Sequence, residues 1–176
     1  MIVYRELLEC ELNRDLFRYF IRRQVVTDCW RRVDGQWTVR PAPFVDDWSE
    51  EDFQTLIRCL KNTVRTGGFL RAAFWEDRLK GFVSVESELF GGERRYLDLT
   101  SIHVSADMRG RGIGRALFEA AKSWAAERGA RRLYISAHSA VETQSFYRAM
   151  GCVEAEAYCE KHVDAEPFDC QLERAL

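Results

Sequence analysis

The feature that most constrains the fold is a glycine- and arginine-rich turn between a predicted strand and a predicted helix, within residues 96–129. Residues 96–104 mix polar side chains with β-branched and aromatic ones, which is typical of a strand. Apolar residues then recur at helical spacing until Gly129 ends the pattern: Ile113, Ala116, Leu117, Ala120, Ala121 and Trp124. The sequence therefore predicts a strand–turn–helix unit of a mixed α/β protein.

The turn has the chemistry of an anion site. Glycines let backbone N–H groups approach a ligand closely, and a helix N-terminus adds unpaired donors and a positive dipole end. Arg109, Arg111 and Arg115 add positive charge, so we expect a polyphosphate here. The dinucleotide fingerprint would need a glycine at Arg115 or Leu117, and the nucleoside-triphosphate loop would need Gly-Lys-Ser/Thr, which the chain lacks. The alternative is a surface turn with solvated arginines.

Composition restricts the class of protein. A length of 176 residues predicts one domain, and a net charge of -2 argues against a nucleic-acid binder. No apolar run approaches the ~18 residues that a membrane span needs, and early charges argue against a signal peptide. The six cysteines lack paired CxxC spacing. We therefore expect reduced thiols in a cytoplasmic protein, with no metal, no membrane and no nucleic acid as partner.

The rest of the chain reads as alternating strands and helices. A hairpin is predicted over 29–40 with its turn at Asp34-Gly35, and Ser139 with Glu142 forms a capping box. Strands are predicted at 2–7, 69–75, 79–90, 96–104, 132–136, 153–158 and 170–176, and helices at 13–23, 49–66, 113–128 and 139–151. The order is that of a mixed α/β domain.

Two motifs resemble the Gcn5-related N-acetyltransferase (GNAT) family. Arg109-x-x-Gly112-x-Gly114 is similar to its pyrophosphate-binding motif, and residues 145–152, Ser-Phe-Tyr-Arg-Ala-Met-Gly-Cys, are similar to its closing motif. The asparagine often found about two turns earlier is absent, and Ala140 stands there. The resemblance implies an α/β (α+β mixed) fold: a central mixed, mostly antiparallel sheet of about six to seven strands flanked by four helices.

The resemblance also implies acetyl-CoA as cosubstrate, with no metal. It implies one domain over 1–176, with an acceptor-side region at 1–65 and an acetyl-CoA-binding core at 96–151. The cofactor-binding residues that it implies are Ile102, His103, Val104, Arg109, Gly110, Arg111, Gly112, Ile113, Gly114 and Arg115.

Direct acetyl transfer needs a proton acceptor and a proton donor. By resemblance, Tyr147 protonates the departing sulfur, and Asp98 matches the position of a glutamate base in histone-acetylating members. The alternatives are a packing tyrosine and a solvated strand carboxylate. Strict alternation would place His103 on the opposite face from Asp98. The weaker candidates for the base are Glu86, Glu88 and His138.

The acceptor is not specified by the sequence. An aromatic and acidic cluster either forms a wall for a cationic amine or packs as a hairpin: Trp30, Trp37, Phe44, Asp46, Asp47 and Trp48. We expect an N-acetyltransferase for a small-molecule or peptide amine, and the resemblance allows a homodimer. The alternative is a non-catalytic acyl-CoA-binding or partner-regulating module on the same fold.

Overall fold

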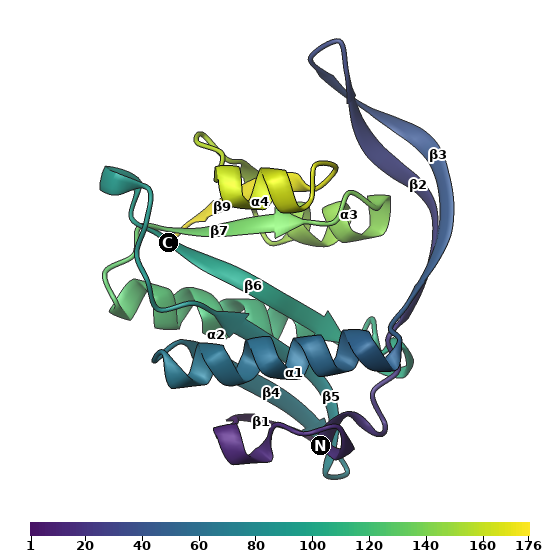
Figure 1. The fold of residues 1–176 in the computed structure, drawn as a ribbon, viewed down its shortest axis with the longest axis vertical. Helices are drawn as coiled ribbons and strands as arrows, with labels where there is room; N and C mark the ends of the chain where they lie inside the picture. Colours follow the sequence, from purple (N-terminus) through teal and green to yellow (C-terminus); the bar gives the residue numbers. More distant parts are fainter.

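The centre of the protein is a seven-stranded sheet in the order β1-β4-β5-β6-β7-β9-β8, seen in a computed structural model that describes residues 1–176 (Figure 1). Only β6 and β7 run parallel, so the predicted mixed, mostly antiparallel sheet is confirmed. Its strands are β1 (Ile2–Glu6), β4 (Phe69–Trp75), β5 (Arg78–Val85), β6 (Tyr96–Val104), β7 (Arg132–Ala137), β8 (Val153–Glu154) and β9 (Cys170–Ala175).

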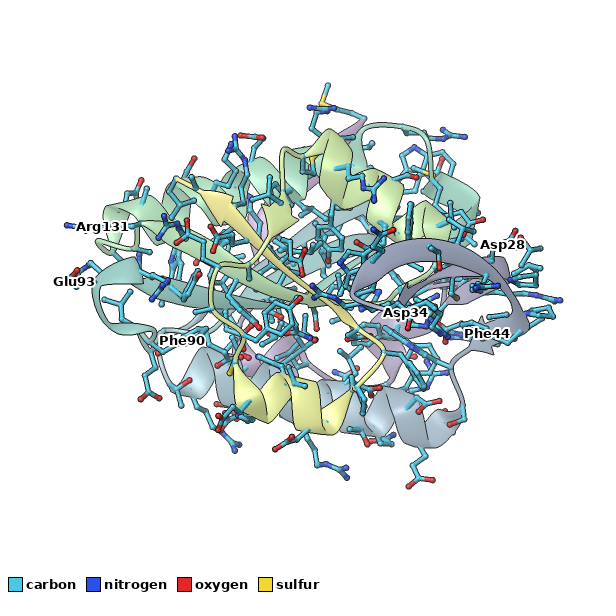
Figure 2. The ribbon with its side chains drawn as sticks, turned by 90° about the horizontal axis from the view of Figure 1, so that it is seen from above. Asp28, Asp34, Phe44, Phe90, Glu93 and Arg131 are labelled. Atoms are coloured by element: carbon cyan, nitrogen blue, oxygen red, sulfur yellow. The ribbon has the colours of Figure 1, made fainter.

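Helices cover both faces of this sheet. Figure 2 shows α1 (Glu50–Arg65) and α4 (Glu160–Ala165) on one face, with α2 (Ile113–Glu127) and α3 (Val141–Ala149) on the other. On the α2 face, Leu97, Leu117 and Leu133 are fully buried in the larger apolar core. A second core under α1 contains Phe17 and Phe82. No helix is long and apolar enough to cross a membrane.

Helix α1 begins where its capping residues predict. The Ser49 N–H donates to Asp52 Oδ2 at 2.7 Å, and the Asp52 N–H donates to Ser49 Oγ at 3.2 Å. This reciprocal pair satisfies two N–H groups that the first turn otherwise leaves free. Gly67, with φ 79°, follows the end of the helix.

The predicted helix at 13–23 is wrong. A short 3₁₀ turn at Asp15–Phe17 lies in this region instead, after another at Glu9–Glu11. The backbone of Ile21 is held by tertiary contacts: its N–H donates to Ser105 Oγ at 2.9 Å, and its carbonyl accepts from the Ala106 N–H at 2.9 Å. These bonds fix the chain in a non-helical path toward the next strand.

The predicted hairpin is much longer than 29–40. Strands β2 (Arg23–Val33) and β3 (Gln36–Asp47) form a two-stranded ribbon that rises away from the sheet, with its turn at Asp34-Gly35 as predicted (Figure 1). Pro41 and Pro43 lie within β3 rather than ending it. Each strand of such a ribbon keeps one free edge, where the missing N–H of a proline costs no ladder bond.

The capping box predicted at Ser139 is also wrong. Ala140 is the N-cap of α3 and makes no side-chain cap, while Ser139 Oγ accepts from Arg31 Nη1 at 2.6 Å. The Ser139 carbonyl accepts from the Trp30 N–H at 2.8 Å, so the ribbon holds the start of α3. The strand expected at 153–158 is limited to the two residues of β8. The fold has the expected four helices, because α4 takes the place of the helix predicted at 13–23.

Candidate functional site

A gap between β6 and β7 forms the centre of the candidate site. The two strands pair only from Tyr96 to Asp98 of β6 and from Arg132 to Tyr134 of β7. Beyond that point they diverge, although β6 continues to Val104 and β7 to Ala137. One backbone edge of β6 is therefore unpaired along residues 99–104, beside a cavity of ≈ 690 Å³.

The glycine turn closes one end of this cavity. Gly110 (φ 74°) and Gly112 (φ 79°) have left-handed backbones, and a side chain at either would point into open space. Gly112 is the N-cap of α2, whose first turn contains no acidic residue and no side-chain cap. A Cβ at Gly114 would lie 3.0 Å from Phe146. The turn thus presents free N–H groups, as an anion site requires.

Most residues that the resemblance implies for the cofactor line this cavity. They are Ile102, His103, Val104, Arg109, Gly110, Gly112, Ile113, Gly114 and Arg115. Arg111 is exposed and is not part of the lining. Their roles stay predictions.

Tyr147 lies on α3 and lines the cavity. It is 6% exposed, and its ring lies 6.4 Å from that of Phe118 and 5.2 Å from that of Phe146, measured between centroids. Burial raises the pKa of Tyr147 above its ordinary value, and the charges of Cys152 and Asp169 act in the same direction. A phenol in this setting stays protonated at neutral pH and keeps a proton to donate.

A β-bulge in β6 changes which side chains share a face. Ser84 pairs with Ser101 but Val85 pairs with Leu99, so Thr100 is the extra residue. The expectation that His103 and Asp98 lie on opposite faces is therefore wrong. Both lie on the side of α1 and α4, because the bulge shifts the alternation by one residue.

The environment of His103 keeps it neutral. Its ring centroid lies 4.8 Å from that of Trp48 and 5.4 Å from that of Phe82. Burial, followed by the positive charges of Arg22 and Arg109, lowers the pKa of His103 to about 3. Arg22 forms an ion pair with Asp46 at 2.5 Å, while its Nε and Nη1 are buried without partners.

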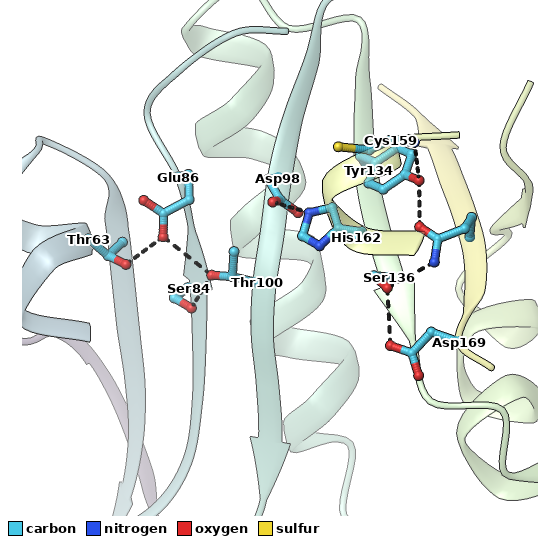
Figure 3. Close-up of polar contacts among 11 residues, drawn as sticks. Thr63, Ser84, Glu86, Asp98, Thr100, Tyr134, Ser136, Cys159, His162 and Asp169 are labelled. Atoms are coloured by element: carbon cyan, nitrogen blue, oxygen red, sulfur yellow. Dashed lines mark hydrogen bonds and ion pairs between the residues drawn. The ribbon is translucent and has the colours of Figure 1, made fainter. Parts of the chain in front are cut away.

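The structure does not bring Asp98 to the cavity. Its Oδ2 lies 2.6 Å from Nε2 of His162 on α4, and its buried Oδ1 has no partner (Figure 3). Glu86 accepts from the Thr63 hydroxyl at 2.6 Å and does not line the cavity either. His138 does line it, and its Nδ1 accepts from the Ala140 N–H at 3.0 Å. Asp98 therefore stays a prediction as the base.

The aromatic cluster is divided by the structure. Trp30 and Trp37 pack against the α2-side core, whereas Trp48 stacks on Phe20 and contacts His103. Phe44 of the ribbon lies 5.3 Å from His138, measured between ring centroids. Only the Trp48 end reaches a side chain of the cavity wall on β6.

Sequence reasoning missed several polar residues that line the cavity, among them Ser136 and Asp169. Ser136 lies near the carboxyl end of β7, and Asp169 immediately precedes β9. The pairing of Ala137 with Cys170 brings the two close together, and Ser136 Oγ lies 3.1 Å from Asp169 Oδ2. Ligands often bind at the carboxyl end of a parallel strand. The residues at the end of β7 and just before the antiparallel strand β9 could have been predicted on this ground.

Comparisons with known proteins identify the family and agree with the fold. The model of the Acetyltransferase (GNAT) family matches residues 31–152. A nourseothricin acetyltransferase structure is 21% identical with a TM-score of 0.66, over 98% of this chain and 95% of that chain. A putative streptothricin acetyltransferase from Bacillus anthracis str. Ames, in complex with acetyl coenzyme A, is 17% identical with a TM-score of 0.69, over 98% and 96%.

A PaiA N-acetyltransferase from Thermoplasma acidophilum, in complex with coenzyme A, is 17% identical with a TM-score of 0.63, over 100% of this chain and 99% of that chain. No curated protein sequence matches the chain. The matched family model spans more than half of the sequence and includes both the glycine turn and the Tyr147 motif. The chain therefore belongs to the GNAT acetyltransferase family.

Proposed function

We propose that the protein is an acetyl-CoA-dependent N-acetyltransferase that transfers the acetyl group directly to an amine. The gap between β6 and β7 carries this proposal. The cavity beside this gap is lined both by the glycine turn, the proposed anion site, and by Tyr147, the proposed proton donor. A pyrophosphate and a thioester on one extended ligand need these two sites.

The residues present fit acetyl-CoA. The uncapped N-terminus of α2 offers N–H donors to the phosphates, and Arg109 and Arg115 add charge beside them. The unpaired edge of β6 offers backbone donors and acceptors to the amide groups of the pantetheine arm. When bound, acetyl-CoA supplies an activated acetyl group, while the chain positions it and manages the protons.

The protein's chemical task is to handle two protons. A lysine-type amine has a pKa of about 10.4, so deprotonating it at pH 7 costs about 4.6 kcal/mol, from ~3.4 units at 1.36 each. A base beside the bound amine lowers this cost. Tyr147 is the proposed donor to the sulfur. Asp98, the base that the resemblance implies, would need water to bridge from its contact with His162 to the cavity.

The acceptor side is proposed to lie on the face of α1 and α4. Segment 1–65 supplies Arg22 and Gln24 to the cavity, and Trp48 supports its wall through His103. Amines with different shapes therefore form the first panel: spermidine, tyramine, lysine methyl ester, a lysine-containing peptide and a streptothricin. The last is included because a similar structure carries streptothricin in its name.

The test is release of coenzyme A from acetyl-CoA, followed with a thiol reagent, with mass spectrometry of each amine. We expect one or more amines to gain one acetyl group per thiol released. Tight binding of acetyl-CoA in calorimetry with no amine-dependent release would instead identify a non-catalytic acyl-CoA-binding module.

A further inference from the structure

We propose that Asp169 receives the ammonium group of the acceptor and removes its proton, an inference that rests on the proposed function. Asp169 lines the cavity together with Ser136 and Tyr147. The next residue, Cys170, pairs with Ala137 at the end of β7, which places Asp169 at the carboxyl end of β7, where β6 and β7 have diverged.

A chain of four hydrogen bonds ends on this carboxylate (Figure 3). The Cys159 N–H donates to the Tyr134 hydroxyl oxygen at 2.9 Å, and that hydroxyl donates to Gln171 Oε1 at 2.5 Å. Gln171 Nε2 donates to Ser136 Oγ at 3.0 Å. The Ser136 hydroxyl then donates to Asp169 Oδ2 at 3.1 Å.

The direction of this chain is fixed. A backbone N–H only donates and an ionised carboxylate only accepts, so the two ends of the chain fix the direction of the bonds between them. Tyr134 is fully buried and Gln171 is 2% exposed, where unpaired polar groups would be costly. The chain therefore holds Asp169 by Oδ2 as a hydrogen-bond acceptor and leaves Oδ1 for a ligand in the cavity.

The other carboxylates lack this combination of position and support. Glu142 and Glu166 also line the cavity, but both are exposed, whereas Asp169 is partly buried. Asp98 lies outside the lining and contacts His162. Asp169 is thus the one lining carboxylate that can offer a cation a partly desolvated, oriented partner.

The charges around Asp169 suit a base. Burial raises the pKa of the Asp169 carboxyl, and Glu166 acts in the same direction. The hydrogen bond from Ser136 lowers that pKa, as do the charges of His138 and His162. A raised pKa brings a carboxylate closer to the range in which it removes protons efficiently at neutral pH. The Asp169 charge also helps keep Tyr147 protonated.

The protons and bonds balance in this arrangement. The acceptor ammonium loses one proton to Asp169, and its nitrogen lone pair forms the N–C bond to the acetyl carbonyl. The C–S bond breaks, and the sulfur takes a proton from Tyr147. The second proton lost by the nitrogen restores the Tyr147 hydroxyl, so the products are an amide, a free thiol and protonated Asp169, which releases its proton to solvent.

Asp169→Asn tests this role, because the amide keeps the shape and can still accept from Ser136. With the fastest amine of the panel, we expect kcat/KM at pH 7 to fall by about 10²–10⁴-fold. The dissociation constant of acetyl-CoA should not change. The lost activity should recover as pH rises toward the pKa of the amine, since free amine then forms without a base. Asp164→Asn, an exposed carboxylate on α4, is the matched control.

Ser136→Ala and Ser136→Thr test the hydrogen-bonded chain. Removing the hydroxyl takes a donor from the ionised carboxylate, so the acid limb of the kcat/KM profile should move to higher pH. Threonine retains the hydroxyl, so the acid limb of Ser136→Thr should lie at its wild-type pH. A purely structural role would change stability in both variants and leave the limb in place.

The outcomes are distinguishable. A folded Asp169→Asn enzyme with the wild-type rate and pH profile overturns the role of Asp169 while the proposed function stands. Recovery at high pH in Asp98→Asn, and not in Asp169→Asn, also overturns it and places the base at Asp98. A wild type that acetylates no amine in the panel overturns the proposed function together with this inference.

Discussion

At the scale of single residues, Tyr147 has the clearest proposed task. Its burial raises its pKa, so the hydroxyl is present as a donor across the neutral range. Tyr147→Phe keeps the ring contacts with Phe118 and Phe146 and removes only the hydroxyl. We expect kcat to fall by about 10²–10⁴-fold with unchanged acetyl-CoA affinity, measured by steady-state kinetics and calorimetry.

This loss should persist at high pH, because free amine does not replace a donor to the sulfur. The contrast with Asp169→Asn separates the two proton transfers. An unchanged kcat in Tyr147→Phe would assign the donor to water and leave the tyrosine a packing role.

His103 offers a prediction about pH. Burial and then Arg22 and Arg109 lower its pKa to about 3, below the ordinary 6.5. Between these values the unfolded chain binds a proton that the native protein does not, so the free energy of unfolding should fall as pH drops through this window. Arg22→Met removes one positive neighbour and should raise the pKa of His103 while leaving it below 6.5, measured by NMR of the imidazole protons.

His103→Gln is the control for this measurement, since it should lose both the titrating signal and its share of the acid destabilisation. A native His103 that titrates near 6.5 would contradict the account of its burial.

At the scale of elements, the proposed anion-binding role of the turn before α2 depends on the left-handed backbone of its glycines. Gly112→Glu places a negative, bulky side chain at a left-handed residue, φ 79°, in the turn proposed to bind the pyrophosphate. We expect acetyl-CoA binding to be lost in calorimetry. Gly35→Glu is matched to it, because Gly35 has φ 77° and equally open surroundings but lies in the ribbon turn.

The control should share any strain from the left-handed backbone yet bind acetyl-CoA normally. Equal affinity in Gly112→Glu and the wild type would remove the pyrophosphate from this turn.

Elements whose information is local were predictable from the sequence. The strand–turn–helix unit and the cap at Ser49 depend on neighbouring residues, and both occur where expected. The bulge at Thr100 and the path around Ile21 depend on partners far along the chain, namely β5 and Ser105. Helical spacing at 13–23 therefore predicted an element that tertiary hydrogen bonds override.

At the scale of the whole molecule, the site is assembled by topology. Tyr147 lies within a recognisable local motif, residues 145–152, so the sequence indicated it. Asp169 reaches the cavity only because β9 runs antiparallel to β7. No local pattern marks Asp169. The hydrogen-bonded chain that ends on it joins Cys159, the N-cap of α4, to β7 and β9. Without the strand register, the sequence does not distinguish a solvated aspartate from one that is held in the cavity by hydrogen bonds.

The β2–β3 ribbon is expected to open independently of the seven-stranded sheet. It pairs with no strand of the seven-stranded sheet, and a two-stranded ribbon has little stability of its own. Trp30 connects it to the body: its N–H donates to the Ser139 carbonyl, and Arg148 lies 4.5 Å above its ring. We expect ribbon amides to exchange hydrogen faster than those of β5 and β6 in native-state exchange.

Trp30→Ala should increase exchange across β2 and β3 by about 5–30-fold, as expected for the loss of one or two kcal/mol of docking. The sheet amides of β5 and β6 should keep their rates. Val39→Ala, at the cross-strand partner that is 45% exposed, should change little and serves as the matched control. If Trp30→Ala accelerates exchange equally in the ribbon and the sheet, the ribbon and the sheet unfold as one cooperative unit.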